Sequence, residues 1–347
     1  TVQGNGFAKT AEEMIAGYQS QRSQHNGAYL IICPDIPEVI EILEYLADWK
    51  RKMGHQTQLV TLTETGSTND QIKNYIQNAY DNWEDQPEYV LLVGDVSGNI
   101  VIPSWFIAGY LTAYDVTDHP YSLLEGEDYF PDVMVGRLSV QSLGELQTVA
   151  SKIIGYSGAP PMESDWFTRA IMCSYVIDYG GHYQMYSQRE TVMAVREKLL
   201  DFTYTEVDTF ISPWQNGATN LANMINDGYS FINYRGAGSP AYWAGASNYL
   251  FSIWDFPLLN NGFMLPMVTS IVCGGGNFAD ESYTTSFGEM WLVSGTSQSP
   301  AGGIAFIGPS ELDTKTPFNN CNDMGIYQGI TQEGIFGSAA MMLRGKM

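Results

Sequence analysis

Two short apolar runs, each ending abruptly in glycine, constrain the fold of this 347-residue chain more than any other feature. Residues 229–234 are followed by Gly236-Ala237-Gly238-Ser239, and residues 266–272 are followed by Cys273 and three glycines. Short apolar runs bounded by glycine are typical of strands in a buried parallel sheet. In open α/β sheets, ligands bind at the carboxyl ends of the strands. The sequence therefore predicts one crevice in which Cys273 faces the 236–239 loop.

The rest of the chain alternates between strand patterns and helix patterns. Apolar residues recur at helical spacing between the strand-like runs, and Ser142-x-x-Glu145 and Ser187-x-x-Glu190 are capping boxes that open helices. Repeated strand-helix-strand order requires parallel pairing with right-handed crossovers. We therefore predict an α/β fold. Its further strands are expected at residues 29–33, 58–62, 89–93, 132–135, 168–176, 203–207 and 303–308, and a C-terminal helix at about 323–343, broken near Gly329 and Gly334.

A linker divides this alternation into two series. Gly158-Ala159-Pro160-Pro161 combines residues that are typical of turns. We predict a polar N-terminal extension over residues 1–25, a first α/β subdomain over 26–160 and a second over 161–347. Each subdomain is expected to be a three-layer αβα unit with a mainly parallel sheet.

The composition argues against several classes of function. The chain carries 38 acidic and 16 basic residues, a formal net charge of −22, with the acidic excess spread over both halves. Because an acidic surface repels phosphate backbones, no nucleic-acid partner is expected. No apolar run approaches the length of a membrane span, and no Gly-x-x-x-x-Gly-Lys-Ser/Thr phosphate loop is present, so neither membrane insertion nor nucleotide binding is predicted. The four cysteines show no disulfide or metal-site spacing.

Cys273 is the candidate nucleophile. At a strand end before three glycines, backbone N–H groups can turn toward a substrate oxygen. The alternative is a small buried apolar residue, because free cysteine is often buried. A nucleophilic cysteine also needs a neighbouring base, usually an imidazole. None of the four histidines lies in the 236–239 loop, so the residues alone do not identify a base.

The motifs resemble those of the gingipain family of cysteine peptidases, relatives of the caspases. That family carries Tyr-x-Gly-His-Gly-Ser followed by a Trp, and a second strand that ends in the nucleophilic cysteine. The corresponding residues here are 234–239 with Trp243, and 271–278, within a resemblance that spans about residues 28–345. It implies a caspase-like second subdomain and a cysteine endopeptidase that hydrolyses peptide bonds. One departure is that Ala237 stands where the family has its catalytic histidine.

The resemblance also implies roles for neighbouring residues. Asp178 aligns with the acidic residue that orients the catalytic histidine, although it could instead stabilise its own turn. The backbone N–H groups of Cys273 and Gly238 are expected to hold the oxyanion, as in the caspases. The expected substrate-binding residues are Arg235, Gly236, Trp243, Val272 and Glu311. Glu311 could favour a basic substrate side chain and Arg235 an acidic one, so the substrate's charge stays open.

With alanine at position 237, no group remains to protonate the leaving amine, and we expect peptide binding with slow turnover or none. Two explanations stay open: a deliberate inactivating substitution, or a natural peptide-binding pseudopeptidase. The first is favoured because Cys273, its glycines and Asp178 are all retained. His182 is an alternative base, but a lone loop histidine is more often simply solvated.

The remaining expectations concern metals, partners and location. Members of the family bind structural calcium, and carboxylates gather near Asp95, Asp115, Asp118 and Asp128, although a solvated acidic loop would have the same composition. No cofactor is expected for catalysis. The expected partner is a peptide or protein substrate, bound by a monomer that is secreted by a bacterium or held at its surface.

Overall fold

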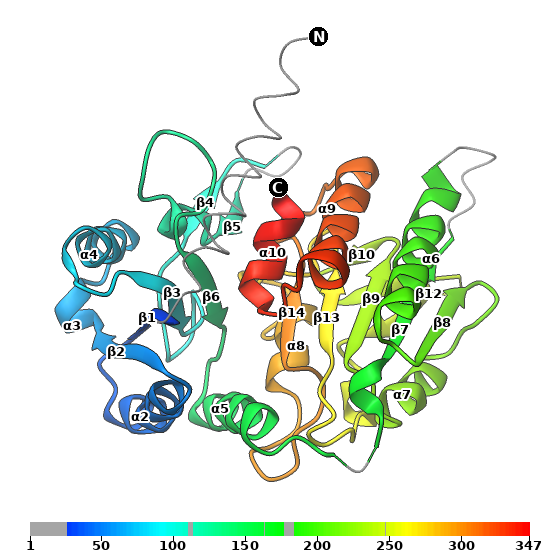
Figure 1. The fold of residues 1–347 in the computed structure, drawn as a ribbon, viewed down its shortest axis with the longest axis horizontal. Helices are drawn as coiled ribbons and strands as arrows, with labels where there is room; N and C mark the ends of the chain where they lie inside the picture. The colour runs from blue at the N-terminus through cyan, green and yellow to red at the C-terminus, as the bar shows by residue number, and fades with distance from the viewer. Residues whose placement is uncertain (1–25, 110–113, 163, 177–183, 247) are drawn as a thin grey trace.

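Two parallel β-sheets form the frame of the structure (Figure 1). The computed structural model describes residues 26–109, 114–162, 164–176, 184–246 and 248–347, and all structural statements below refer to these residues. The first sheet has the strand order β2 (His55–Thr61), β1 (Asn26–Cys33), β3 (Pro87–Val93) and β6 (Met134–Leu138). The second has the order β14 (Ala305–Ile307), β13 (Met267–Ser270), β9 (Phe231–Arg235), β7 (Arg169–Tyr175) and β8 (Glu206–Ser212). Every neighbouring pair in these two sheets is parallel, as predicted.

Helices cover both faces of the first sheet. The helices are α2 (Pro37–Lys52), the short α3 (Leu62–Thr65), α4 (Asn69–Asn82) and α5 (Leu143–Gly158). Successive side chains of a strand point to opposite faces, so Ile31 of β1 packs with α2 and α5 while Leu30 packs with α4. Ser142 caps α5 as predicted, because its side chain accepts a hydrogen bond from the Glu145 backbone N–H. The capping box predicted at Ser187 is wrong, because Ser187 lies inside α6, which spans Gln184–Phe202.

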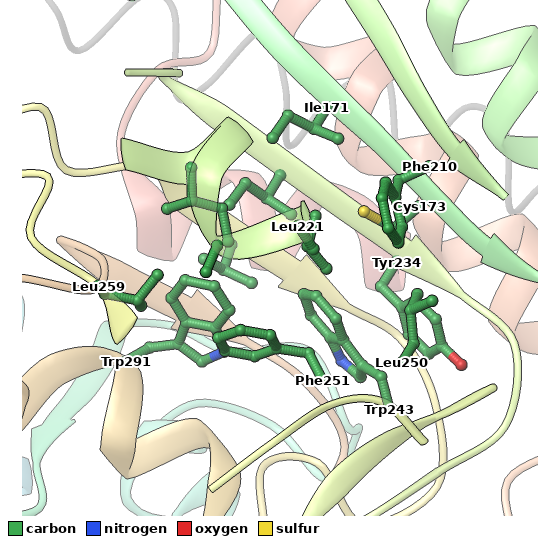
Figure 2. Close-up of a cluster of buried hydrophobic side chains, with 14 of the residues drawn as sticks. Ile171, Cys173, Phe210, Leu221, Tyr234, Trp243, Leu250, Phe251, Leu259 and Trp291 are labelled. Atoms are coloured by element: carbon green, nitrogen blue, oxygen red, sulfur yellow. The ribbon is translucent and has the colours of Figure 1, made fainter. Parts of the chain in front are cut away.

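The second sheet is covered in the same way. On one face lie α6 (Gln184–Phe202), α9 (Thr316–Gln328), the π-helical η4 (Gly329–Glu333) and α10 (Ser338–Lys346). On the other face lie α7 (Ala218–Asn226) and α8 (Phe287–Val293), around a core in which aromatic rings pack closely (Figure 2). The two units are therefore each three-layered, as the alternating pattern predicted.

Smaller elements were not predicted from the sequence. Between β9 and β13 the chain forms an antiparallel sheet of β10 (Gly238–Ser239), β11 (Tyr242–Gly245) and β12 (Asn248–Ser252). A second antiparallel pair is β4 (Trp105–Ile107) with β5 (Asp115–Thr117). Short 3₁₀ turns are η1 (His119–Ser122), η2 (Trp166–Thr168) and η3 (Phe256–Leu258). Strands of two to five residues carry too little alternation to stand out from loop sequence.

Several predicted boundaries are wrong. The strand predicted at 203–207 is β8, which begins at Glu206 and extends to Ser212. The strand predicted up to residue 272 ends at Ser270, so Cys273 lies in a turn beyond it. The predicted C-terminal helix begins earlier, at Thr316, with Pro317 in its first turn. The predicted break near Gly334 is present, because this glycine adopts a left-handed φ of 68° after the π-helical segment.

The two sheets are joined by buried polar contacts. The Lys152 ammonium of α5 donates to the backbone oxygens of Trp291 and Leu292, at the end of α8 (3.1 and 2.5 Å). The Ser139 hydroxyl donates to the Glu289 carboxylate of α8 at 2.5 Å. Helix α10 lies beside β6 in Figure 1, so the C-terminal segment also touches the first unit. The sheets lie on either side of the predicted boundary at residue 160, which itself stays a prediction.

No helix in the described part of the chain has both the length and the apolar character needed to span a bilayer.

Candidate active site

The carboxyl ends of β9 and β13 bring the two glycine-bounded loops together. The strands pair in register, with Tyr234 opposite Ser270. A Cβ atom placed on Gly238 would lie 3.5 Å from the Cys273 backbone oxygen and only 2.6 Å from Cγ2 of Val272. Only glycine therefore fits at position 238, where the two loops approach each other. The predicted approach of the 236–239 loop to Cys273 is present.

Cys273 is half-buried, and its thiol has a hydroxyl neighbour. Its Sγ lies 3.4 Å from Oγ1 of Thr314, and this oxygen accepts a hydrogen bond of 2.7 Å from the Asn319 side-chain amide. The Asn319 amide thus uses one lone pair of the Thr314 hydroxyl oxygen, and the hydroxyl proton remains available to point at the sulfur. Thr314 was not predicted as a site residue. The available signal was its place beyond the carboxyl end of β14, the same edge of the sheet.

The segment after β14 also fixes the glycines that follow Cys273. The Gly274 backbone N–H donates to the Glu311 backbone oxygen, and the Gly276 N–H donates to the Pro309 oxygen, both at 2.8 Å. Glu311, predicted to bind substrate, therefore contributes at least its backbone to the loop that carries Cys273. Gly274 adopts a left-handed φ of 63°, which favours glycine at this turn.

Ala237 directly precedes β10, the first strand of the small antiparallel sheet. The Ala244 N–H donates to the Ala237 oxygen at 2.9 Å, and the next pair along the ladder is Gly238 opposite Trp243. Hydrogen-bonded and non-hydrogen-bonded pairs alternate in an antiparallel ladder. Because Ala237 and Ala244 are hydrogen-bonded, Gly238 and Trp243 are not, and the Gly238 N–H points away from β11. The buried Tyr234 hydroxyl donates to the backbone oxygens of Ala237 (2.8 Å) and Ala244 (3.0 Å). The loop conformation is thus set by the backbone and by Tyr234.

Trp243 lies beneath this loop. It is 0% exposed, stacks on Tyr234 with 4.6 Å between ring centroids, and donates its indole N–H to the Ser270 hydroxyl at 2.8 Å (Figure 2). Val272 is also 0% exposed. Both residues were predicted to bind substrate. The structure places their side chains in the core beneath the cleft, where they support its floor.

Comparisons with known proteins place the chain in a family. The sequence model of one family matches residues 22–347. The chain belongs to peptidase family C25. This finding confirms the resemblance to the gingipains that the sequence motifs carry.

Individual gingipains are similar to this C25 chain over most of its length. Gingipain R2 of Porphyromonas gingivalis is 26% identical over 314 residues, which are 87% of this chain and 40% of that protein. Lys-gingipain of the same organism is 28% identical over 217 residues, which are 60% of this chain and 12% of that protein. The chain therefore spans less than half the length of these relatives.

Solved gingipain structures share the fold. The crystal structure of the Arg-specific cysteine proteinase gingipain R superposes with a TM-score of 0.82 at 21% identity, covering 93% of this chain and 72% of that one. A complex of the pro- and mature domains of RgpB from P. gingivalis gives a TM-score of 0.79 at 22% identity, with 92% and 73% coverage. These likenesses confirm the predicted α/β class with mainly parallel sheets.

Arg235 does not face the cleft of this C25 chain. Its side chain is 0% exposed, and its guanidinium donates to the Ile271 backbone oxygen and to Oδ1 of Asn320 on α9. The nearby carboxylate of Asp323 favours the charged form, but burial outweighs it and lowers the pKa of Arg235. The expectation that Arg235 could attract an acidic substrate side chain is wrong. Instead, Arg235 ties α9 to the chain just before Cys273, and the adjoining Gly236 is likewise buried.

The other predicted acids and bases lie elsewhere. Asp178 and the alternative base His182 fall outside the described residues, so their predicted roles stay predictions. The two described histidines are engaged away from Cys273. The His55 ring of β2 meets the stacked rings of Tyr29 and Tyr89 edge-on, and the His119 ring contacts the Tyr129 backbone oxygen at 3.0 Å.

The predicted calcium cluster is not assembled by the described carboxylates. Asp118 forms a partly buried ion pair with Arg137 (2.7 Å). Asp95 accepts from the Gln141 side chain (2.5 Å), and Asp128 accepts from its neighbour Phe130 (2.9 Å). Buried Asp115 lies in β5. Within the described ranges no three His, Cys, Asp or Glu side chains gather as a metal site, and structural calcium stays a prediction.

Proposed function

We propose that this chain is the catalytic unit of a cysteine peptidase, with Cys273 as nucleophile and with its general base missing at position 237. The observation that carries the proposal is the packing of Gly238 against Cys273 at the carboxyl ends of two parallel strands. Membership of peptidase family C25 supports the class of reaction. The substrate is a peptide or protein.

The reaction needs a histidine at position 237. Its imidazole would take the Cys273 thiol proton, and the thiolate would attack the substrate's carbonyl carbon to form an S–C bond. The N–H groups of Cys273 and Gly238 would hold the oxyanion. The imidazolium would return the proton to the amine as the C–N bond breaks. Water would then hydrolyse the thioester, releasing a carboxylic acid and restoring the thiol.

Thr314 has a role that survives the loss of the base. Its hydroxyl oxygen lies 3.4 Å from Sγ of Cys273 and accepts a hydrogen bond from the Asn319 side-chain amide. Because a thiolate has no proton to give, the Thr314 hydroxyl would be the donor to it. A hydrogen bond to the charged form of a group favours that form. Thr314 is therefore placed to donate to the thiolate, which is the reactive state of cysteine.

Alanine at position 237 removes the proton transfers. General acid–base catalysis contributes about 10²–10⁴-fold to the rate. The rate falls by more when the base of a nucleophile–base pair is removed, because the two residues act together. The chain as written therefore binds peptide and cleaves it slowly or not at all. A deliberate substitution would explain the retained nucleophile and glycines. The second candidate function, a natural peptide-binding pseudopeptidase, is favoured only by Ala237 itself.

The decisive experiment restores the base. Ala237→His is compared with the unchanged chain and with Ala237→Gln, which adds a polar side chain that cannot exchange a proton near neutral pH. All three are assayed on a mixed fluorogenic peptide library, together with Ala237→His/Cys273→Ala. Cleavage by Ala237→His alone supports the peptidase proposal. A folded Ala237→His protein that cuts no peptide would overturn it in favour of the pseudopeptidase.

Location, calcium and oligomeric state extend the same proposal. A secreted or surface-held bacterial protein with structural calcium, acting as a monomer, is what the family resemblance predicts. Each prediction has a direct measurement: fractionation of the native cells, calcium titration by calorimetry, and light scattering of the purified chain.

A further inference from the structure

We propose that four aromatic side chains beside the cleft form a subsite for apolar side chains of an extended peptide. They are Tyr242, Tyr249, Trp254 and Tyr283, called the aromatic row below. The inference rests on the proposed peptidase function and deepens it, because it names the class of substrate that the cleft selects.

The four rings form one continuous row. Ring centroids lie 6.2 Å apart for Tyr242 and Tyr249, 6.2 Å for Tyr249 and Trp254, and 6.3 Å for Trp254 and Tyr283. Trp254 is 59% exposed, and the three tyrosines are half-buried. Tyr242 and Tyr249 lie on β11 and β12, whereas Tyr283 lies in the loop that follows Cys273. The row therefore links the two segments that bound the cleft.

The row shares a face with position 237. Along β10 and β11, Gly238 and Trp243 point to the core, so the alternating residues point the other way. Tyr242 pairs with Ser239, and Ala244 pairs with Tyr249 across to β12. The residue that replaces the catalytic histidine thus lies on the same open face as the first two rings. A peptide that passes Cys273 and position 237 continues onto the aromatic row.

The spacing of the rings matches an extended peptide. A strand rises about 3.4 Å per residue and presents alternate side chains to one face, which gives a repeat of about 7 Å. The rings follow one another at 6.2–6.3 Å, close to that repeat. Aromatic faces bind apolar and aromatic side chains through burial and ring contact. We therefore expect the substrate to carry apolar residues at alternate positions. These positions lie in the part of the peptide that extends from position 237 over the aromatic row.

Binding to the unchanged chain tests this directly, because Ala237 leaves the peptide uncut. Two fluorescein-labelled peptides are compared by anisotropy, one with phenylalanine at alternate positions and one with serine there. We expect tighter binding of the phenylalanine peptide. That difference should shrink about 2- to 13-fold in Trp254→Ala or Tyr249→Ala, since one aromatic contact is worth about 0.5–1.5 kcal/mol. Tyr45→Ala, which removes an exposed tyrosine from α2, is the matched control and should change nothing.

The outcomes separate this inference from the peptidase proposal. Equal binding of the two peptides, an unchanged preference in Trp254→Ala, or no binding of either peptide would overturn the aromatic subsite. None of these results depends on cleavage by Ala237→His. Conversely, an inactive Ala237→His protein whose phenylalanine preference still falls in Trp254→Ala would overturn the peptidase proposal and keep the subsite.

Discussion

The hydrogen bond between Trp243 and Ser270 gives the sharpest test of how the cleft is supported. Both residues are 0% exposed, and the indole N–H donates to the serine hydroxyl at 2.8 Å. Ser270→Ala removes the acceptor and leaves the indole N–H buried with no partner. Leaving a buried donor unsatisfied costs about 1–3 kcal/mol, so we expect a loss of that size in the free energy of unfolding.

The same sheet offers a matched control. Ser174 on β7 is also 0% exposed, but its hydroxyl has no hydrogen-bond partner among the described residues. Ser174→Ala removes a buried hydroxyl that makes no compensating hydrogen bond in the folded state. It should leave the free energy of unfolding unchanged or raise it by about 1 kcal/mol. The two serine-to-alanine changes should therefore have opposite or clearly unequal effects.

A double-mutant cycle completes the test. Trp243→Phe removes the donor while keeping a ring to stack on Tyr234, and the double variant with Ser270→Ala removes both polar partners. The double variant should lose about 1–2 kcal/mol less than the sum of the single losses, because neither polar group is left unpaired. Urea unfolding, followed by fluorescence and circular dichroism, measures the free energy of unfolding of the unchanged chain, the two single variants and the double variant. Additive losses, or equal effects of Ser270→Ala and Ser174→Ala, would refute the reasoning.

Three further predictions follow from the same contacts. Thr314→Val removes the hydroxyl beside Cys273 and should slow alkylation of that cysteine by iodoacetamide several-fold at neutral pH, measured by peptide mass spectrometry. Gly238→Ala places a Cβ 2.6 Å from Cγ2 of Val272 and should destabilise the fold by about 1–3 kcal/mol and weaken peptide binding. Burial raises the pKa of Glu289 from 4.5 to about 7, so the folded state keeps a proton that the unfolded chain loses. Stability should therefore fall as pH rises from about 4.5 to 7, and Glu289→Gln should flatten that part of the curve.

Each of these predictions has a control in the chain. The exposed Cys321 reports general alkylation and should react equally in Thr314→Val. A Cβ on Gly144 of α5 would meet no atom within 4 Å, so Gly144→Ala should be tolerated. Glu41 is exposed on α2, and Glu41→Gln should leave the pH profile of stability unchanged. A flat pH profile for the unchanged protein would contradict the role given to Glu289.

The main frame could be predicted because its signals are local. A parallel strand buried on both faces is a continuous apolar run, and a capping box marks a helix start within four residues. The meeting of Cys273 with the 236–239 loop followed from one topological rule, that parallel strands end at the same edge. These features need no knowledge of which distant segments touch.

The parts that were missed depend on distant contacts. Thr314 reaches Cys273 across 41 residues of sequence. Arg235 was expected at the surface because arginine is rarely buried without a partner. Its partners, Asn320 and the Ile271 backbone, come from a helix and a turn far along the chain. The strands that carry Tyr242 and Tyr249 were not predicted, since β10 to β12 are too short to show their pairing in the sequence.

The structure separates the architecture of the cleft from its chemistry at position 237. The backbone of Ala237 is held by Ala244 and by the Tyr234 hydroxyl, and neither contact involves the side chain at 237. Residue 237 is partly exposed, and its side chain lies on the opposite face of the small sheet from the buried Trp243. Exchanging histidine and alanine there should therefore change the reaction and leave the fold, Cys273 and the aromatic row in place. The proposed peptide binding and the proposed cleavage therefore depend on different residues, and they have to be measured as separate properties.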